Sequence, residues 1–184
     1  MNSPDISIRD SLSSAGRDFL DYWLSLRAGR MMPDRAEFDP SNIKHLLPNI
    51  VIHELIAPDN IRLRLVGTAI VRHYGSESTG KNYLDFVEPD RRAKASKAIF
   101  LVRNHPAGMT VTLISSLDSG NLDFRQTVAL PIGDERENRK FVYFCSTRQE
   151  RSERSLTEPE RLAVQNVMDR RFFDIGAGIP DFTD

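Results

Sequence analysis

Five segments of this 184-residue chain have the composition or alternation of β-strands, and their order restricts the fold. Two of them, residues 49–56 and 61–67, are joined by a short turn. Three more follow closely one after another, at residues 109–117, 122–132 and 141–147. A hairpin, a helical insert and a three-stranded meander predict one five-stranded antiparallel sheet with helices on one face, in the α+β class.

The helical insert between these two groups of strands is interrupted twice by glycine. A short helix over residues 69–74 ends at Gly75, and Gly80 allows a second tight turn. The longest helix in this half lies within residues 88–108, where Pro106 ends it. A chain that breaks a helix twice this close to a strand is suited either to wrapping around a ligand or to a short crossover that covers the sheet.

Amphipathic helices are expected on both sides of the sheet segments. Near the N-terminus, the run from Ser14 to Gly29 places Phe19, Trp23 and Leu26 on one stripe. Near the C-terminus, Thr157 and Glu160 have the spacing of a capping box and predict a helix start. The apolar stripe of this last helix consists of Val164, Val167, Met168 and Phe172.

The chain therefore divides into four parts. Residues 1–13 are expected to be flexible, and residues 14–38 to form a flanking helix and a connector. Residues 39–148 form the sheet core, and residues 149–184 a linker, a C-terminal helix and a tail.

Charge and composition exclude several partners. With 25 basic and 26 acidic residues the net charge is −1, so the chain has no basic field for nucleic acid. Its apolar runs are shorter than the roughly 20 residues that span a bilayer, so no membrane association is expected. The one cysteine, Cys145, excludes an intramolecular disulfide and a cysteine-rich zinc site. We expect a reducing, cytoplasmic setting.

Several short motifs, taken in order, resemble the PAS domain family. The chain is similar to a group of stand-alone bacterial PAS-like proteins over about residues 18–148. The motifs are Asp21-Tyr22-Trp23, Pro33, Asp39-Pro40, Leu46-Leu47-Pro48 and Arg64-Leu65-Val66-Gly67-Thr68. The resemblance implies a PAS-like sheet whose helical insert closes a pocket. It also implies a sensory or regulatory module of bacterial signalling that acts through protein partners.

The resemblance also bears on the cofactor, which the sequence leaves unknown. Light-sensing flavin-binding PAS proteins carry a reactive cysteine where this chain has Tyr83, and Cys145 lies far away on the last strand of the meander. Heme-binding relatives use a histidine on the long helix, but residues 89–104 contain none and His105 stands at the helix end. We therefore expect the purified protein to carry neither flavin nor heme.

Gln126 is the polar residue that most suggests a ligand site. It interrupts an apolar strand face between Phe124 and Val128, and a buried amide without partners costs about 1–3 kcal/mol. One reading makes Gln126 a ligand contact, with Tyr83 and Tyr143 as walls of the pocket. The alternative is a hydrogen bond to a neighbouring group, with both tyrosines packed in the core.

No catalytic or metal-binding residues are assigned. His45 and His73 are expected near the surface and His53 half-buried in a strand, and their spacing matches no helical metal site. A sensory module that is not an enzyme is therefore the first reading. The alternatives are a small-molecule enzyme that uses a cone-like α+β cavity, and a ligand-free dimerisation domain.

The stripe of the first helix is a candidate dimer interface. Phe19, Trp23 and Leu26 must be covered, because large apolar patches are rare on monomers. Self-association into a homodimer through this helix is one expectation, and packing back onto the chain's own sheet is the alternative. The stripe of the predicted last helix is a second candidate surface.

Overall fold

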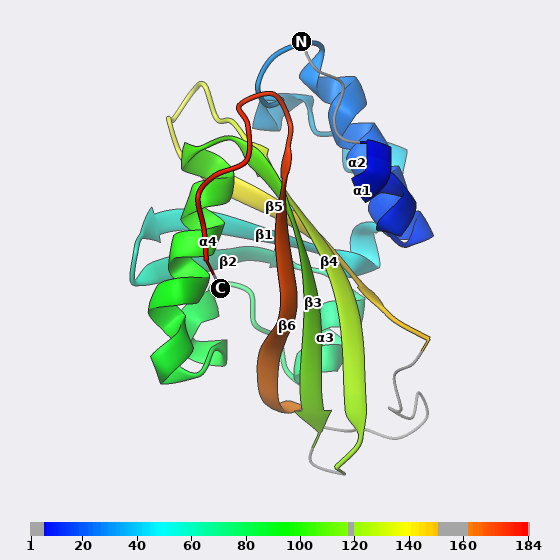
Figure 1. Ribbon diagram of the computed structural model, residues 1–184, viewed down its shortest axis with the longest axis vertical. Coiled ribbons are helices and arrows are strands. Elements are labelled where there is room, and N and C mark those ends of the chain that lie inside the picture. The colour runs from blue at the N-terminus through cyan, green and yellow to red at the C-terminus, as the bar shows by residue number, and fades with distance from the viewer. Residues whose placement is uncertain (1–5, 118–119, 151–161, 184) are drawn as a thin grey trace.

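The structure is a computed structural model that describes residues 6–117, 120–150 and 162–183, and its centre is one antiparallel sheet (Figure 1). Within these residues the sheet has six strands in the order β2-β1-β5-β4-β3-β6. The strands are β1 (Ile50–Ala57), β2 (Asn60–Val66), β3 (Ala107–Leu117), β4 (Leu122–Ile132), β5 (Phe141–Arg148) and β6 (Leu162–Asp174). All five strands expected from the sequence are present, and the α+β class is confirmed.

The C-terminal segment is a strand, so the prediction of a last helix is wrong. β6 pairs with β3 from Asp174 opposite Ala107 to Leu162 opposite Leu117. A register shift places Val167 opposite Leu113 and Asp169 opposite Thr112, so Met168 is the extra residue of a bulge. This bulge produces an irregular apolar spacing that imitates a helical stripe. The predicted helix start at 157–160 lies outside the described residues.

Helices cover both faces of the sheet (Figure 1). α3 (Thr68–Tyr74) and α4 (Arg92–Asn104) pack on one face, which we call the inner face, together with the short 3-10 turn η4 (Tyr83–Phe86). α2 (Ser14–Arg27) packs on the other, which we call the outer face. The bounds of the remaining short elements are α1 (Ile6–Ser11), η1 (Arg35–Glu37), η2 (Pro40–Ile43), η3 (Leu47–Asn49) and η5 (Pro89–Arg91).

The apolar stripe of α2 is buried against the chain's own sheet. Phe19 and Trp23 are 0% and 1% exposed, and Leu26 is half-buried. The Trp23 indole donates a hydrogen bond of 2.8 Å to the Pro131 carbonyl of β4. The structure thus shows the intramolecular arrangement that was the alternative to a dimer interface at this helix.

The predicted flexible N-terminus contains a described helix. Within residues 6–13, α1 lies beside α2, and Arg9 contacts the Asp21 carboxylate at 2.6 Å. Both side chains are close to half-exposed, so this ion pair contributes little stability by itself.

Two of the sequence motifs, Leu46-Leu47-Pro48 and Arg64-Leu65-Val66-Gly67-Thr68, meet at Gly67. Its amide donates to the Ile50 carbonyl at 2.8 Å, at the start of β1. A Cβ atom at this position would lie 2.4 Å from the carbonyl oxygens of both Leu47 and Pro48. Only glycine therefore fits between the end of β2 and the turn that precedes β1.

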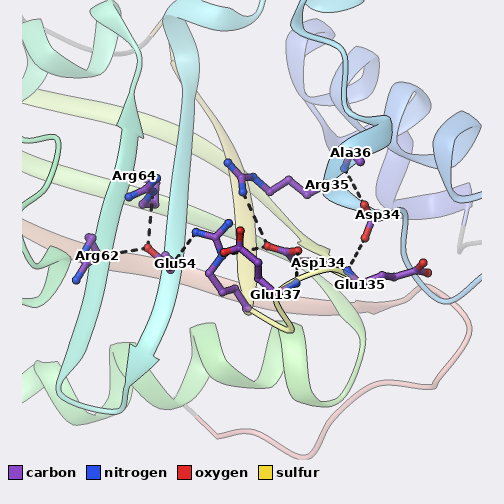
Figure 2. A network of polar contacts seen from close by, with 10 residues as sticks. Asp34, Arg35, Ala36, Glu54, Arg62, Arg64, Asp134, Glu135 and Glu137 are labelled. Carbon is purple, nitrogen blue, oxygen red and sulfur yellow. Dashed lines mark hydrogen bonds and ion pairs between the residues drawn. The ribbon is translucent and has the colours of Figure 1, made fainter.

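A network of polar contacts joins the connector after α2, at residues 34–36, to the turn between β4 and β5 (Figure 2). The Asp34 carboxylate accepts hydrogen bonds from the amides of Ala36 at 2.8 Å and Glu135 at 2.7 Å. On the neighbouring strands, the buried Glu54 lies 3.6–3.8 Å from three guanidinium groups, those of Arg62, Arg64 and Arg139. Arg139 joins the two parts, because its guanidinium group lies 3.8 Å from Glu54 and 3.1 Å from Asp134 in the β4–β5 turn.

We predict that Gly67→Ala lowers the free energy of unfolding by about 1–3 kcal/mol, because the new methyl group overlaps two backbone carbonyls. Urea denaturation measures this change. Gly133→Ala is the matched control, since its nearest neighbour would be at an ordinary 3.4 Å, and it should change stability by at most about 0.5 kcal/mol. Equal losses in both variants would contradict the close approach at Gly67.

We also predict that Trp23→Ala costs about 3–5 kcal/mol, because it leaves a cavity under α2 and an unpaired carbonyl at Pro131. Leu26→Ala on the same helix should cost clearly less, since Leu26 is only half-buried. Denaturation and light scattering together decide the role of the stripe. A Trp23→Ala protein that keeps its stability but changes from dimer to monomer would instead support the interface reading.

Candidate functional site

A cavity of about 60 Å³ lies between the inner face of the sheet and the helical insert. Most of its wall is apolar and comes from α3, α4, β1, β3, β5 and β6: Val51, Ile70, Ala95, Ala98, Ile99, Met109, Val111, Leu113, Phe144 and Val167. A cavity of about 150 Å³ holds one benzene molecule. This cavity therefore accommodates only a few heavy atoms, far fewer than a flavin or a heme.

Arg125 and its neighbours on β4 and β5 form a polar part of the wall. Arg125 is 5% exposed and donates from Nε to Ser146 Oγ at 3.2 Å and from Nη2 to the Ser146 carbonyl at 2.7 Å. The Thr127 hydroxyl donates to the same Ser146 Oγ at 2.8 Å. These bonds hold the guanidinium group against β5, where it lines the cavity.

His53 on β1 supplies another polar group of the wall. The centre of its ring lies 4.6 Å from the ring centre of Tyr83 and 4.3 Å from that of Phe144. The residue is 4% exposed. Burial lowers the pKa of His53 to about 3, so the imidazole is neutral at physiological pH. Its Nδ1 atom has no hydrogen-bond partner among the described residues, which is a costly arrangement for a buried polar atom.

Behind the cavity lies a buried network of His73, Asp123, Arg148 and Ser115. His73 Nδ1 lies 3.0 Å from one Asp123 carboxylate oxygen, and Arg148 Nε donates to the other at 3.0 Å. His73 Nε2 lies 3.4 Å from Ser115 Oγ. Burial alone would raise the pKa of Asp123, but His73, Arg148 and the nearby Arg125 outweigh it and lower the pKa to about 2.

This network has the composition of a nucleophilic triad but not its access to solvent. Ser115 and Asp123 are both 0% exposed, so no substrate carbonyl can reach the hydroxyl in this conformation. The contact from His73 to Ser115 is also long for a hydrogen bond that would activate a nucleophile. The arrangement therefore holds α3 onto β3 and β4, and it places His73 in the cavity wall.

An open groove of about 440 Å³ adjoins the cavity. It runs between η4 and α4 on one side and β3 and β6 on the other. Six residues line both spaces: Tyr83, Ala95, Leu113, Gln165, Val167 and Arg170. The groove is thus an entrance to the cavity, and the helical insert and β6 form its two sides.

The structure does not bring the three predicted ligand residues together. Tyr83 lines the cavity, as expected, but Gln126 and Tyr143 lie on the outer face. Gln126 Oε1 accepts from the Ser13 amide at 2.6 Å, and its Nε2 donates to the Ser11 carbonyl at 2.9 Å. Gln126 therefore makes the neighbouring backbone contacts that were the alternative reading, and it joins β4 to the start of α2.

Tyr143 and Cys145 lie on the outer face of β5. The Tyr143 ring packs edge-on against Phe38 with 4.8 Å between ring centres, as in ordinary core packing. Cys145 is buried beneath α2, and burial raises the pKa of its thiol to about 12. Tyr83 and Cys145 are thus on opposite faces of the sheet.

Sequence reasoning missed Arg125, Thr127, His53 and His73 as cavity residues. Arg125 and Thr127 are polar residues that alternate with apolar ones along β4, and α3 and α4 cover the face on which they lie. His73 was expected near the surface and is 2% exposed, whereas His45 is exposed and pairs with Asp18 at 3.1 Å. The helical spacing of His73 from Ile70, three residues earlier on α3, was the available signal that it faces the core.

The comparisons with known proteins agree with this architecture. A sequence model of the PAS domain family matches residues 11–141, which is most of the chain. The chain therefore belongs to the PAS domain family, whose members are generally sensory or regulatory and not catalytic. None of the curated proteins matches it.

Two further features limit the kind of site. Among the described residues, no group of three or more histidine, cysteine and acidic side chains is placed to hold a metal ion. No helix in the described part of the chain is long and apolar enough to cross a membrane.

We predict that His53 makes the protein less stable as the pH falls from 6.5 towards 4.5. Its pKa is about 3 in the folded protein and near 6.5 when unfolded, so in this range the unfolded state binds the extra proton. This one group lowers the free energy of unfolding by up to about 1.4 kcal/mol per pH unit. His53→Phe should remove that slope in urea denaturation, while the exposed His45→Phe should retain it. An unchanged slope in His53→Phe would contradict a buried neutral imidazole.

Proposed function

We propose that this PAS domain is a sensory module of a bacterial regulatory pathway that binds a small ligand in its inner cavity. A protein partner binds the domain differently when the ligand is present and when it is absent. Family membership supports the regulatory role, and the inner cavity supports the ligand.

The observation that carries the proposal is His53 Nδ1 in the cavity wall, for which the described part of the chain supplies no hydrogen-bond partner. A buried polar atom normally has a partner, because leaving it without one costs about 1–3 kcal/mol. Here the residue lines a space that adjoins an open groove. A ligand that hydrogen bonds to His53 offsets this cost in the bound state.

The enzyme alternative has less support. Within the described residues, the arrangement that resembles catalytic machinery places Ser115 and Asp123 where they have no exposed surface. The cavity wall is mainly apolar, as expected for a binding pocket.

Self-association belongs to the same proposal, but through a surface other than the stripe of α2. The outer face carries two well-exposed apolar side chains, Ile56 and Leu65, at 45% and 40%. Leu65 lines an open depression beside Tyr143 and Pro48. No residue of α2 lines this depression, and we propose that a second copy of the chain contacts the sheet there.

Native mass spectrometry of freshly purified protein tests ligand binding. We expect one small molecule per chain, lost on denaturation. In Ala98→Val two added methyl groups enter the cavity, so this variant should lose the molecule while remaining folded. Ala93→Val, on the exposed side of the same helix, should retain it.

Two outcomes would overturn the proposal. One is a protein that carries no ligand and gains no thermal stability from any member of a small-metabolite library. The other is equal ligand retention by Ala98→Val and wild type, because that would place the ligand elsewhere.

A further inference from the structure

The two edges of the sheet differ in how they are covered. β2 forms one edge, and the helical insert closes it. The Leu63 amide donates to the Lys81 carbonyl at 2.9 Å, and the Gly80 amide donates to the Leu63 carbonyl at 2.7 Å. The Asn82 side chain continues this pairing, since its Oδ1 atom accepts from the Ile61 amide at 3.0 Å. The chain itself therefore occupies the edge of β2.

β6 forms the other edge of the sheet. It pairs with β3, and within residues 6–117, 120–150 and 162–183 no strand pairs with its other side (Figure 1). In an antiparallel strand, every second residue directs its N–H and C=O groups away from the partner. β6 thus presents backbone donors and acceptors along its outer edge, and such an edge is a template to which a further strand adds.

The open groove beside the inner cavity runs along this edge. Six consecutive residues of β6, at positions 165–170, line it. Side chains alternate between the two faces of a strand, so a groove confined to one face would be lined by every second residue. Lining by consecutive residues indicates that the groove opens onto the edge of β6, where its backbone is within reach.

The wall opposite β6 leaves room for one extended chain. This wall belongs to η4, η5 and α4, and the groove has a volume of about 440 Å³, which is the size of an ordinary binding pocket. A second copy of this protein would bring its own η4 and α4 beside its own β6. If two such edges faced each other, these walls would collide, whereas a single peptide strand has no wall.

The side chains of the groove define the peptide further. Phe86 and Val87 line one side, and Met168, which is 57% exposed, lines the other, so residues that point at them should be apolar. Three basic and two acidic residues line the groove, and one of the acids, Asp169, already lies 3.1 Å from Arg171. Acidic residues at the ends of the peptide would complement this excess of basic groups.

We propose that the outer edge of β6 binds an extended segment of a partner protein as an added strand, with apolar residues at alternate positions and acidic residues at its ends. This inference rests on the partner binding in the proposed function and specifies where the partner binds. It requires no ligand in the inner cavity. Because six residues line both the groove and the inner cavity, the bound segment also covers the entrance to the cavity.

Wild-type protein and a synthetic peptide test the backbone pairing. The probe is the fluorescein-labelled peptide Glu-Val-Thr-Val-Thr-Val-Glu-amide, and fluorescence anisotropy should show saturable binding of one peptide per chain. Two further peptides carry backbone N-methyl groups, one on its valines and the other on its threonines. These two sets of N–H groups point to opposite edges of a strand. One methylated peptide should therefore bind at least about 10-fold more weakly than the probe, and the other should bind about as well.

Substitutions then place the peptide in the groove. Met168→Glu puts a negative charge beside the acidic peptide and removes an apolar contact, so it should weaken binding by at least about 5-fold. Ile179→Glu is the matched control, because Ile179 is similarly exposed, at 63%, but lies outside the groove. It should leave binding unchanged. A peptide with lysine in place of both glutamates should bind more weakly than the probe to the wild-type protein.

Three outcomes would overturn the inference. They are equal binding of the two methylated peptides, equal binding of the probe by Met168→Glu and Ile179→Glu, and no binding of the probe to the wild-type protein. Each leaves the ligand test by native mass spectrometry unaffected, so this inference can fail while ligand binding in the inner cavity holds. If Met168→Glu does not fold, the comparison of the methylated peptides on wild-type protein still decides the question.

Discussion

The sheet of this protein is covered on both faces, and this constraint determines the role of nearly every residue in its central strands. On β4, consecutive side chains alternate between two different environments. Arg125 and Thr127 face the cavity, while Gln126 between them faces α2 and bonds to the backbone at Ser11 and Ser13. Because these three residues are consecutive, a backbone movement that shifts the cavity wall also shifts the attachment of the N-terminal helices. The wall of the inner cavity and the position of α2 are thus connected through one strand.

Burial of both faces also explains which features the sequence could predict. The order of strands and the helical insert follow from local patterns of apolar residues, and those predictions are confirmed. The environments of the Gln126 and Arg125 side chains cannot be predicted from the same patterns. The rule that polar residues face solvent fails when helices cover both faces of the sheet. The sequence showed the alternation of β4 correctly, but it gave no means of deciding which face would contain a polar cavity. The cavity lies on the face of Arg125 and Thr127 because α3 and α4 pack there.

The same argument applies to the last strand. The apolar residues of β6 have a spacing that resembles a helical period. The cause is a bulge at Met168, which adds one residue to an alternating pattern. Local propensity cannot reveal such a bulge, since its cause is the pairing with β3, about fifty residues earlier in the chain. Tyr83 and Tyr143 were both assigned to the pocket wall for an apolar ring with a polar tip, and of the two it is Tyr83, on the insert that wraps the sheet, that lines the inner cavity. Tyr143 belongs to the opposite core.

The position of β6 has a practical consequence for the limits of the domain. The family match ends at residue 141, before most of β5 and all of β6, although β6 pairs with β3 along eleven register positions. A fragment cut at the family limit would leave the β3–β4 hairpin with both outer edges unpaired, because the cut removes β6 and most of β5. Such edges add strands from neighbouring molecules, so the fragment should aggregate more readily than the whole chain. In this protein the antiparallel sheet therefore extends beyond the residues that the family pattern matches.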